Sequence, residues 1–206
     1  MQIGLLGTKI GMTQIFSKNG ICIPVTILRI GPCIITQIKT INSDGYNAIQ
    51  LGYLEIASHL LTRAQIGHLN RSSAPALKYL QEYKVNKPEK FNLGQMITVD
   101  SLKIGDNIQI SGKSIGKGFS GYQKRHNFSR GPMSHGSKNH RQPGSIGAGT
   151  TPGRVFPGKR MAGRLGGYQT TIRNIQIIDI NTEQHFILVK GSIPGKPGNI
   201  VSIQNK

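Results

Sequence analysis

One stretch, residues 111–167, limits what this chain can fold into. Residues 107–178 contain 12 Lys and Arg but no Asp or Glu, whereas the whole chain has 26 Lys and Arg and 8 Asp and Glu. Gly and Pro recur throughout the stretch and aliphatic runs are almost absent, so it cannot form a hydrophobic core of its own. Such a segment becomes ordered when a partner compensates for its lost conformational entropy. The partner that suits an acid-free, cationic segment is a polyanion.

The residues on both sides of this stretch have the pattern of β-structure. Residues 4–12 contain too many glycines for a stable helix and are expected to be extended. In residues 21–29, alternation predicts that Ile21, Ile23, Val25 and Ile27 share one buried face. β-rich runs are predicted at residues 21–29, 34–41, 48–54, 96–99, 107–110, 171–180, 185–190 and 199–203. Neither half makes a satisfactory sheet alone, so we expect one β-barrel with the basic stretch inserted in it.

Residues 55–83 are expected to form a small helical insertion. Thr62 and Gln65 have the spacing of a capping box. Ser73 is predicted to cap a second short helix, with Leu77 and Leu80 facing inward. The predicted organisation is therefore a mainly β chain with four parts: the first part of the barrel (1–110), its helical insertion (55–83), an extended loop (111–167) and the last barrel strands (168–206).

Charge and hydropathy narrow the function classes. A net charge of +18 favours nucleic acid as the partner. No apolar run approaches the ~20 residues of a membrane span, and the N-terminus lacks the basic region of a signal peptide. Cys22 and Cys33 are only two and form no CxxC pair, so we expect buried, reduced thiols in a reducing compartment.

The glycine-rich segment at 116–121 matches the GxGxxG pattern of dinucleotide-binding turns. That function needs a helix directly afterwards and a carboxylate about 20 residues on. Residues 122–127 have no apolar helical stripe, and the next carboxylate is Asp179. We expect no nucleotide cofactor here, although a nucleotide-dependent enzyme is the alternative function. The glycines instead allow the backbone to approach phosphates closely.

Three histidines in the stretch, His126, His135 and His140, have no Cys or carboxylate nearby to form a metal site or a catalytic group. We therefore expect no metal and no catalytic residue, and predict that the histidines contact bases, phosphates or 2′-hydroxyls of RNA. The cations expected to contact phosphates are Lys113, Lys117, Lys124, Arg125, Arg130, Lys138, Arg141, Arg154, Lys159, Arg160 and Arg164. The alternative is a flexible, solvated loop that binds nothing. Such a loop would not need dispersed apolar residues, and this stretch contains Val155, Phe156, Met161 and Leu165.

Four segments also carry a resemblance: GLLGTKIGMTQIF (4–16), DGYNAIQLG (44–52), GKGFSGYQKRHNF (116–128) and SHGSKNHRQPGSIGAGTTPGRVFPGKRMAGR (134–164). The chain resembles the universal uL3 family, large-subunit ribosomal protein L3, in its cyanobacterial and plastid form. The resemblance implies a translation-factor-type β-barrel and a long loop that reaches through 23S-type rRNA toward the peptidyl transferase centre. It also implies ribosomal proteins L14 and L19 as neighbours. Relatives can carry a methylated Gln where this chain has Ala148, so that modification is expected to be absent.

The function expected from residues and resemblance together is that of a structural, non-enzymatic, rRNA-binding constituent of the large ribosomal subunit. A free DNA- or RNA-compacting protein is a further alternative. Sedimentation would distinguish the two, because a ribosomal constituent should sediment with 50S-type particles. The abundance of Ile, Asn and Lys suits an AT-biased plastid genome, and the absence of a transit peptide suits synthesis inside the organelle. We therefore expect the plastid stroma, with a cyanobacterial cytoplasm as the alternative.

Overall fold

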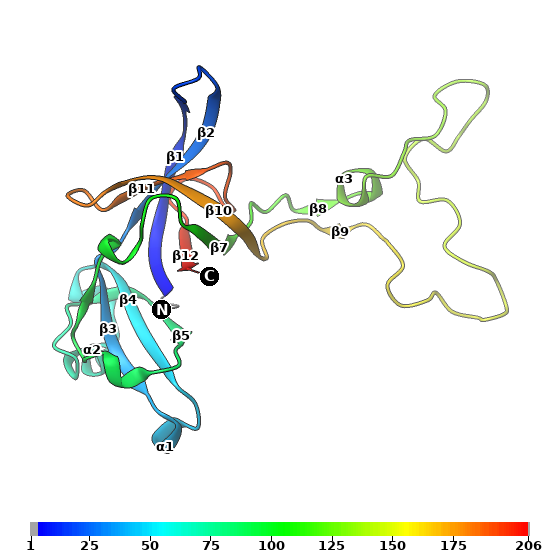
Figure 1. Ribbon diagram of the computed structural model, residues 1–206. Helices are drawn as coiled ribbons and strands as arrows, with labels where there is room; N and C mark the ends of the chain where they lie inside the picture. The colour runs from blue at the N-terminus through cyan, green and yellow to red at the C-terminus, as the bar shows by residue number, and fades with distance from the viewer. Residues whose placement is uncertain (1–3, 206) are drawn as a thin grey trace. The chain divides into compact units, whose positions relative to one another are not determined.

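Six antiparallel strands close into a barrel in the computed structural model, which describes residues 4–205. Their order around the barrel is β1 (Gly4–Phe16), β12 (Ile200–Asn205), β7 (Asn107–Lys113), β10 (Gln169–Asn181), β11 (Phe186–Lys190) and β2 (Cys22–Ile30) (Figure 1). Three of the strands precede the basic stretch and three follow it. The predicted mainly β fold, with a barrel built from both halves of the chain, is therefore confirmed.

Alternation along the strands fills the barrel. Ile108 and Ile110 of β7 and Ile175 and Ile177 of β10 are buried, and most of the residues between them are more exposed. Each fully buried aliphatic side chain contributes roughly 1.5–3 kcal/mol by leaving water. Because β-branched residues also suit the pleated backbone, propensity and burial favour the same structure here.

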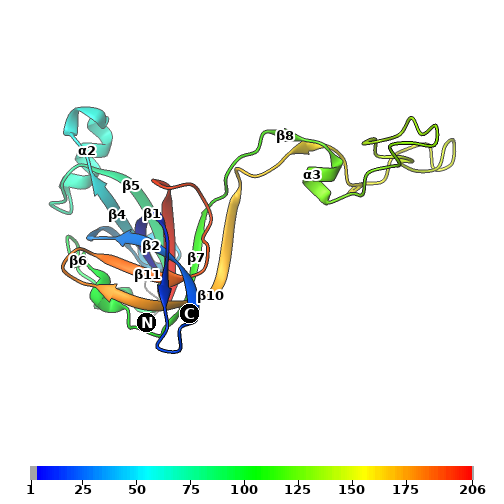
Figure 2. The same ribbon diagram turned by 90° about the horizontal axis from the view of Figure 1, so that it is seen from above.

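The predicted strands at 34–41 and 48–54 were expected to join the barrel, but they do not. They belong to a separate sheet in the order β5 (Leu77–Lys84), β4 (Ala48–Glu55), β3 (Cys33–Lys39) and β6 (Met96–Ile97). Gly31, at φ 65°, turns the chain away after β2. The sheet shares the hydrophobic core of the barrel, and Tyr83 Oη lies 2.8 Å from Ser202 Oγ of β12. Figure 2 shows β4, β5 and the helix α2 (Arg63–Asn70) to one side of the barrel strands.

The helical insertion is only half of what was predicted. The capping box of α2 is present, because Thr62 Oγ1 accepts from the Gln65 amide and Gln65 Oε1 accepts from the Thr62 amide. The second helix is wrong, because residues 77–84 form strand β5. Buried Leu77 and Tyr83 have the same parity, so the segment has a period of two, and Leu80 points away at 39% exposure.

Three smaller expectations also need correction. Cys22, expected to be buried, is exposed, whereas Cys33 is buried. In β2 the fully buried side chains include Leu28 and Ile30 as well as Val25, whereas Ile21 is 63% exposed. Apolar residues occupy both faces of this strand, so alternation alone could not select the inner one. The run predicted at 96–99 leaves the sheet after Ile97. The remaining short elements are α1 (Ile41–Asp44), η1 (Ser58–Leu60), η2 (Pro88–Lys90) and η3 (Val99–Ser101).

A buried lysine fastens the loop between β11 and β12 to the barrel. Lys9 of β1 is 7% exposed, and its Nζ donates to the carbonyls of Ile193 and Gly195 at 3.0 and 2.9 Å. The backbone adds two bonds, from the Lys9 amide to Asn199 O and from the Gly198 amide to Lys9 O. Burial lowers the pKa of Lys9 below its ordinary value of 10.5.

We expect Lys9→Met to reduce the free energy of unfolding by about 2–3 kcal/mol, because it leaves two buried carbonyl groups without their charged donor. Urea denaturation with an unchanged m-value measures the loss. Lys18→Met, on an exposed lysine of the β1–β2 turn, is the matched control. Equal midpoints for the two variants would show that Lys9 does not hold the loop.

Candidate nucleic-acid interface

Residues 114–168, called the basic extension below, form a structural unit separate from the barrel. The extension contains β8 (Phe119–Ser120), α3 (Tyr122–His126) and β9 (Gly163–Arg164), and its remaining residues are turns, bends and irregular chain (Figure 1). Its first predicted residues, 111–113, instead continue β7, because Lys113 pairs with Gln169 and Ser111 with Thr171. Lys113 therefore lies exposed at the end of a barrel strand.

The two arms of the extension are paired near their ends. The Ser114 amide donates to Tyr168 O at 2.9 Å, and the Lys117 amide to Leu165 O at 2.8 Å. Phe119 then pairs with Arg164 across β8 and β9. A side chain at Gly166 would lie 2.0 Å from Ile115 O, so only glycine allows the arms to approach this closely.

A short helix follows the glycine-rich segment, where the sequence predicted none. It spans five residues and ends at Asn127, which is in the left-handed region at φ 59°. Four successive polar or basic residues gave no apolar stripe by which to detect it. The dinucleotide interpretation still lacks its carboxylate, because no Asp or Glu lies between residues 107 and 178.

Helix α3 is fastened to the returning arm at a single carbonyl group. Arg125 Nη1 donates to Met161 O at 2.5 Å, and His126 Nε2 donates to the same oxygen at 3.0 Å. The ring of Phe128 stacks on Tyr122 with centroids 6.1 Å apart and lies 5.9 Å from the His126 ring. The sequence did not predict this cluster. The signal present in the sequence is the spacing of the aromatic rings at residues 122, 126 and 128, but the sequence does not indicate what these rings contact.

His140 similarly supports the local backbone. Its Nδ1 donates to Pro132 O at 2.8 Å, while its carbonyl accepts from the Gly131 amide at 2.9 Å. A side chain at Gly131 would lie 2.0 Å from Asn139 O, so this crossing also requires glycine. His126 and His140, predicted to contact RNA, thus use a ring nitrogen within the extension. The other nitrogen and the ring face remain for a partner.

The other predicted cations lie on the surface. Among the predicted site residues, Arg125, His126 and His140 are half-buried, and the exposed ones are Lys113, Lys117, Lys124, Arg130, His135, Lys138, Arg141, Arg154, Lys159, Arg160 and Arg164. Residues 144–160 are exposed throughout. The guanidinium of Arg154 lies 6.0 Å from the ring centroid of Phe156, which is itself 58% exposed. An exposed ring beside a cation offers a base both stacking and charge.

The extension has no internal charge compensation. In residues 4–205 the one ion pair joins Lys39 to Glu82 at 2.8 Å, in the sheet of β3–β6. The cations of the extension have no carboxylate of their own unit within reach, because the unit contains none. Their charges therefore add to one positive surface that attracts anions.

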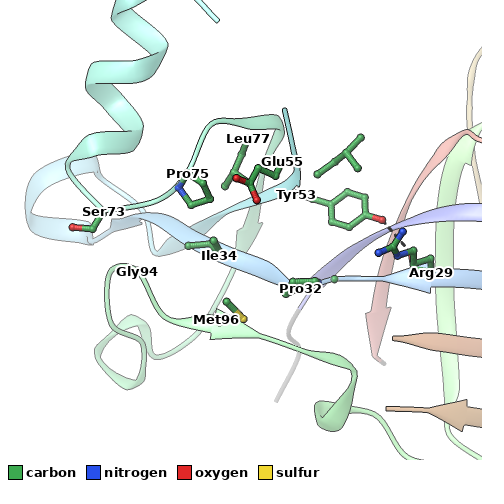
Figure 3. A pocket seen from close by; sticks show the side chains of 12 residues that line it. Arg29, Pro32, Ile34, Tyr53, Glu55, Ser73, Pro75, Leu77, Gly94 and Met96 are labelled. Atoms are coloured by element: carbon green, nitrogen blue, oxygen red, sulfur yellow. Dashed lines mark hydrogen bonds between the residues drawn. The ribbon is translucent and has the colours of Figure 1, made fainter. Parts of the chain in front are cut away.

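The described residues offer little that suits catalysis. No group of three His, Cys, Asp or Glu in residues 4–205 could hold a metal ion, and no helix there is long and apolar enough to cross a membrane. A cavity of about 570 Å³ lies over β3 and β4 (Figure 3). Tyr53 points toward Arg29 there and donates to its carbonyl at 3.3 Å. The charged lining residues are Arg29 and Glu55, and no lining residue is a His or Cys that could activate Ser73.

Comparison with known proteins adds a family to this geometry. A family model described as Ribosomal protein L3 matches residues 81–186. The chain is 64% identical over 203 residues to the large ribosomal subunit protein uL3c of Gracilaria tenuistipitata var. liui, covering 98% of this chain and 99% of that protein. It is 57% identical to uL3c of Porphyra purpurea, with the same coverage, and 56% identical to uL3 of a Synechococcus strain, covering 98% of this chain and 95% of that protein.

Proposed function

Since the chain belongs to the ribosomal protein L3 family, whose members are structural constituents of the large ribosomal subunit, we propose that its basic extension binds the 23S-type rRNA of that subunit. The observation that carries the proposal is the row of exposed cations on a unit without a single carboxylate. Within folded rRNA, phosphates crowd together where hydrated counterions fit poorly. A slender cationic chain can neutralise them there.

Different residues of the extension have different roles. Exposed Lys and Arg side chains contact phosphates, and the arginines can do so with two parallel hydrogen bonds. Arg125 and His126 hold α3 to the returning arm and present their remaining donors to the RNA. The proposed rRNA-binding residues are Lys113, Lys117, Lys124, Arg125, His126, Arg130, His135, Lys138, His140, Arg141, Arg154, Lys159, Arg160 and Arg164.

The wider role follows from the family. We propose that the barrel docks on the rRNA surface, next to ribosomal proteins L14 and L19, while the extension supports subunit assembly and reaches toward the peptidyl transferase centre. The protein acts by binding and not by catalysis. The similarity to plastid-type and cyanobacterial relatives supports a plastid ribosome as the location, with a cyanobacterial ribosome as the alternative.

The tip of the extension provides the test of this function. We expect Arg141→Glu to impair assembly of the subunit or peptidyl transfer, because it replaces a phosphate-binding cation with a repelled anion. Gly147→Val should do the same: at φ 151° a Val side chain strains the backbone of the extension, and because no protein atom lies within 4 Å of an added Cβ, its bulk faces the RNA.

Thermal melts of the free variants should match the wild type, since neither change touches the barrel core. Arg63→Glu, an equal charge reversal on the exposed start of α2, is the control and should assemble normally. The assay is sedimentation of tagged protein with 50S-type particles, followed by peptidyl transfer in the purified particles. A variant that melts several degrees lower yet builds fully active particles would assign the tip to the protein's own fold.

A further inference from the structure

A second cationic site lies on the barrel, where β10 separates from β11. These two strands pair from Ile177 to Asn181 of β10, and the register extends no further back along β10. On its other edge β10 pairs with β7, but the register shifts between Ile172 and Ile175. This β-bulge leaves Arg173 and Asn174 outside the ladder, with Asn174 in the left-handed region at φ 57°. A β-bulge redirects side chains, and this one leaves the edge of β10 unpaired at Arg173 and Asn174.

The separation leaves a hollow of about 420 Å³. Three neighbouring strands contribute to it: Asn107 begins β7, residues 172–176 belong to β10, and Lys190 ends β11, with Gly191 and Ser192 directly after it. Its polar lining consists of two cations, Arg173 and Lys190, and four neutral hydrogen-bonding side chains, those of Asn107, Asn174, Gln176 and Ser192.

The wall formed by residues 190–192 is fixed in place. The Gly191 amide donates to Pro24 O at 2.8 Å, and Thr26 Oγ1 donates to Gly191 O at 2.6 Å. Both contacts tie the end of β11 to β2, and Thr26 is fully buried. Lys190 therefore projects from a rigid backbone toward the hollow, so binding an anion costs little backbone entropy.

No carboxylate lines the hollow to neutralise its cations. The nearest acidic residue in sequence, Asp106, accepts at Oδ2 from the Lys103 amide at 3.2 Å and from Asn205 Nδ2 at 3.4 Å. Asp179 accepts at Oδ1 from the amide of Ile180. Both carboxylates are thus engaged elsewhere, and Arg173 and Lys190 are exposed and face a polar cavity.

We propose that this hollow binds a backbone phosphate of RNA. Arg173 of β10 and Lys190 of β11 supply charge, and the amide and hydroxyl side chains supply neutral donors, a composition that suits phosphate contacts. The inference rests on the proposed rRNA binding but adds a site on the barrel, outside the basic extension. It gives the barrel a fixed point of attachment that does not depend on the order of the extension.

The test uses the full-length chain and transcribed large-subunit rRNA. Each lost phosphate contact reduces the slope of log K against log salt by roughly 0.7–0.9. Arg173→Gln combined with Lys190→Gln should therefore flatten the slope by about 1.4–1.8 relative to wild type. The advantage of the wild type should shrink roughly tenfold as salt rises from ~50 to ~200 mM.

Two controls accompany this variant. Arg63→Gln with Lys90→Gln removes equal charge from exposed positions on α2 and η2 and should leave the slope unchanged. Arg173→Lys with Lys190→Arg keeps the charge and should also keep the slope. If Arg173→Gln with Lys190→Gln gives the same slope of log K against log salt as the α2–η2 control, the hollow binds no RNA phosphate.

Inorganic phosphate is the second probe, because a free anion could fill the same hollow. Shifts of the Arg173 and Lys190 amide resonances at millimolar phosphate, without a change in the RNA slope, would make this a site for free anions and overturn the proposal. The proposed function fails separately. Wild type that does not bind the rRNA refutes both claims. A slope that falls when the extension is neutralised but stays at the wild-type value in Arg173→Gln with Lys190→Gln refutes only the barrel site.

Discussion

Replacing residues 115–167 with a short Gly-Ser linker should remove most of the salt dependence of rRNA binding. If eight cations of the extension meet phosphates, the intact protein has a slope of log K against log salt that is steeper by about 6–7 than that of the shortened one. Ser114 and Tyr168 are joined by a 2.9 Å hydrogen bond, so a short linker can close the gap. The shortened protein keeps every strand of the barrel and should melt at the temperature of the intact protein.

The measurement is a series of rRNA-binding isotherms for both proteins between ~50 and ~400 mM salt. A full-length control with Lys117, Lys124, Lys138 and Lys159 replaced by Gln should lie between them. This control separates charge from length, because it retains the whole extension. Equal slopes for the intact and shortened proteins would move the RNA-binding surface to the barrel.

Hydrogen exchange should show that the extension becomes ordered only with its partner. Strand ladders protect the barrel amides, whereas residues 131–158 have a few isolated backbone bonds, such as that from the Gly153 amide to Gly149 O at 3.2 Å. Chain of this kind, with little buried apolar surface, opens at almost no free-energy cost. We therefore expect exchange in residues 131–158 of the free protein at nearly the rate of unstructured peptide.

Residues 114–128 should exchange more slowly than this tip, because α3 is held at the Met161 carbonyl and the arms are paired near their ends. In the assembled subunit the whole extension should be protected. Strong protection across residues 131–158 without RNA would mean that the extension folds by itself.

Local patterns predicted the structure well where burial and propensity agree. The strands around Ile108, Ile110 and Ile177 alternate clearly, and the capping box at Thr62 depends on residues only three positions apart. The basic stretch was equally easy to recognise, because the absence of Asp and Glu can be read from the sequence without knowing any tertiary contact. These features defined the barrel, one helix and the candidate interface.

The failures concern partners distant in sequence. Residues 77–84 pair with β4, and that pairing converted a segment with helix-like spacing of Leu77 and Leu80 into a strand. Helix α3 depends on a carbonyl group 35 residues away, at Met161. Likewise, β3 and β4 pair in a separate sheet and not in the barrel. Alternation of apolar residues predicts a strand but not the sheet to which the strand belongs.

Two site residues illustrate the same limit. His140 looks in sequence like one more member of a basic, RNA-facing run, but its Nδ1 bonds Pro132 O. Arg173 looks like an ordinary strand residue, yet the β-bulge at 172–175 turns it toward a hollow shared with Lys190. Tertiary contacts therefore decide which polar side chains stabilise the fold and which remain available to a ligand.

A density map of the large subunit containing this chain would show whether the basic extension is embedded in rRNA. We expect continuous density for residues 114–168, with Lys124, Arg141, Arg154 and Arg160 within ~4 Å of phosphate oxygens. Residues 144–153 should lie in a gap between RNA segments too narrow for larger side chains. Density for an ordered barrel with the extension absent, or with the extension packed on proteins and its cations facing solvent, would show that the extension does not bind rRNA.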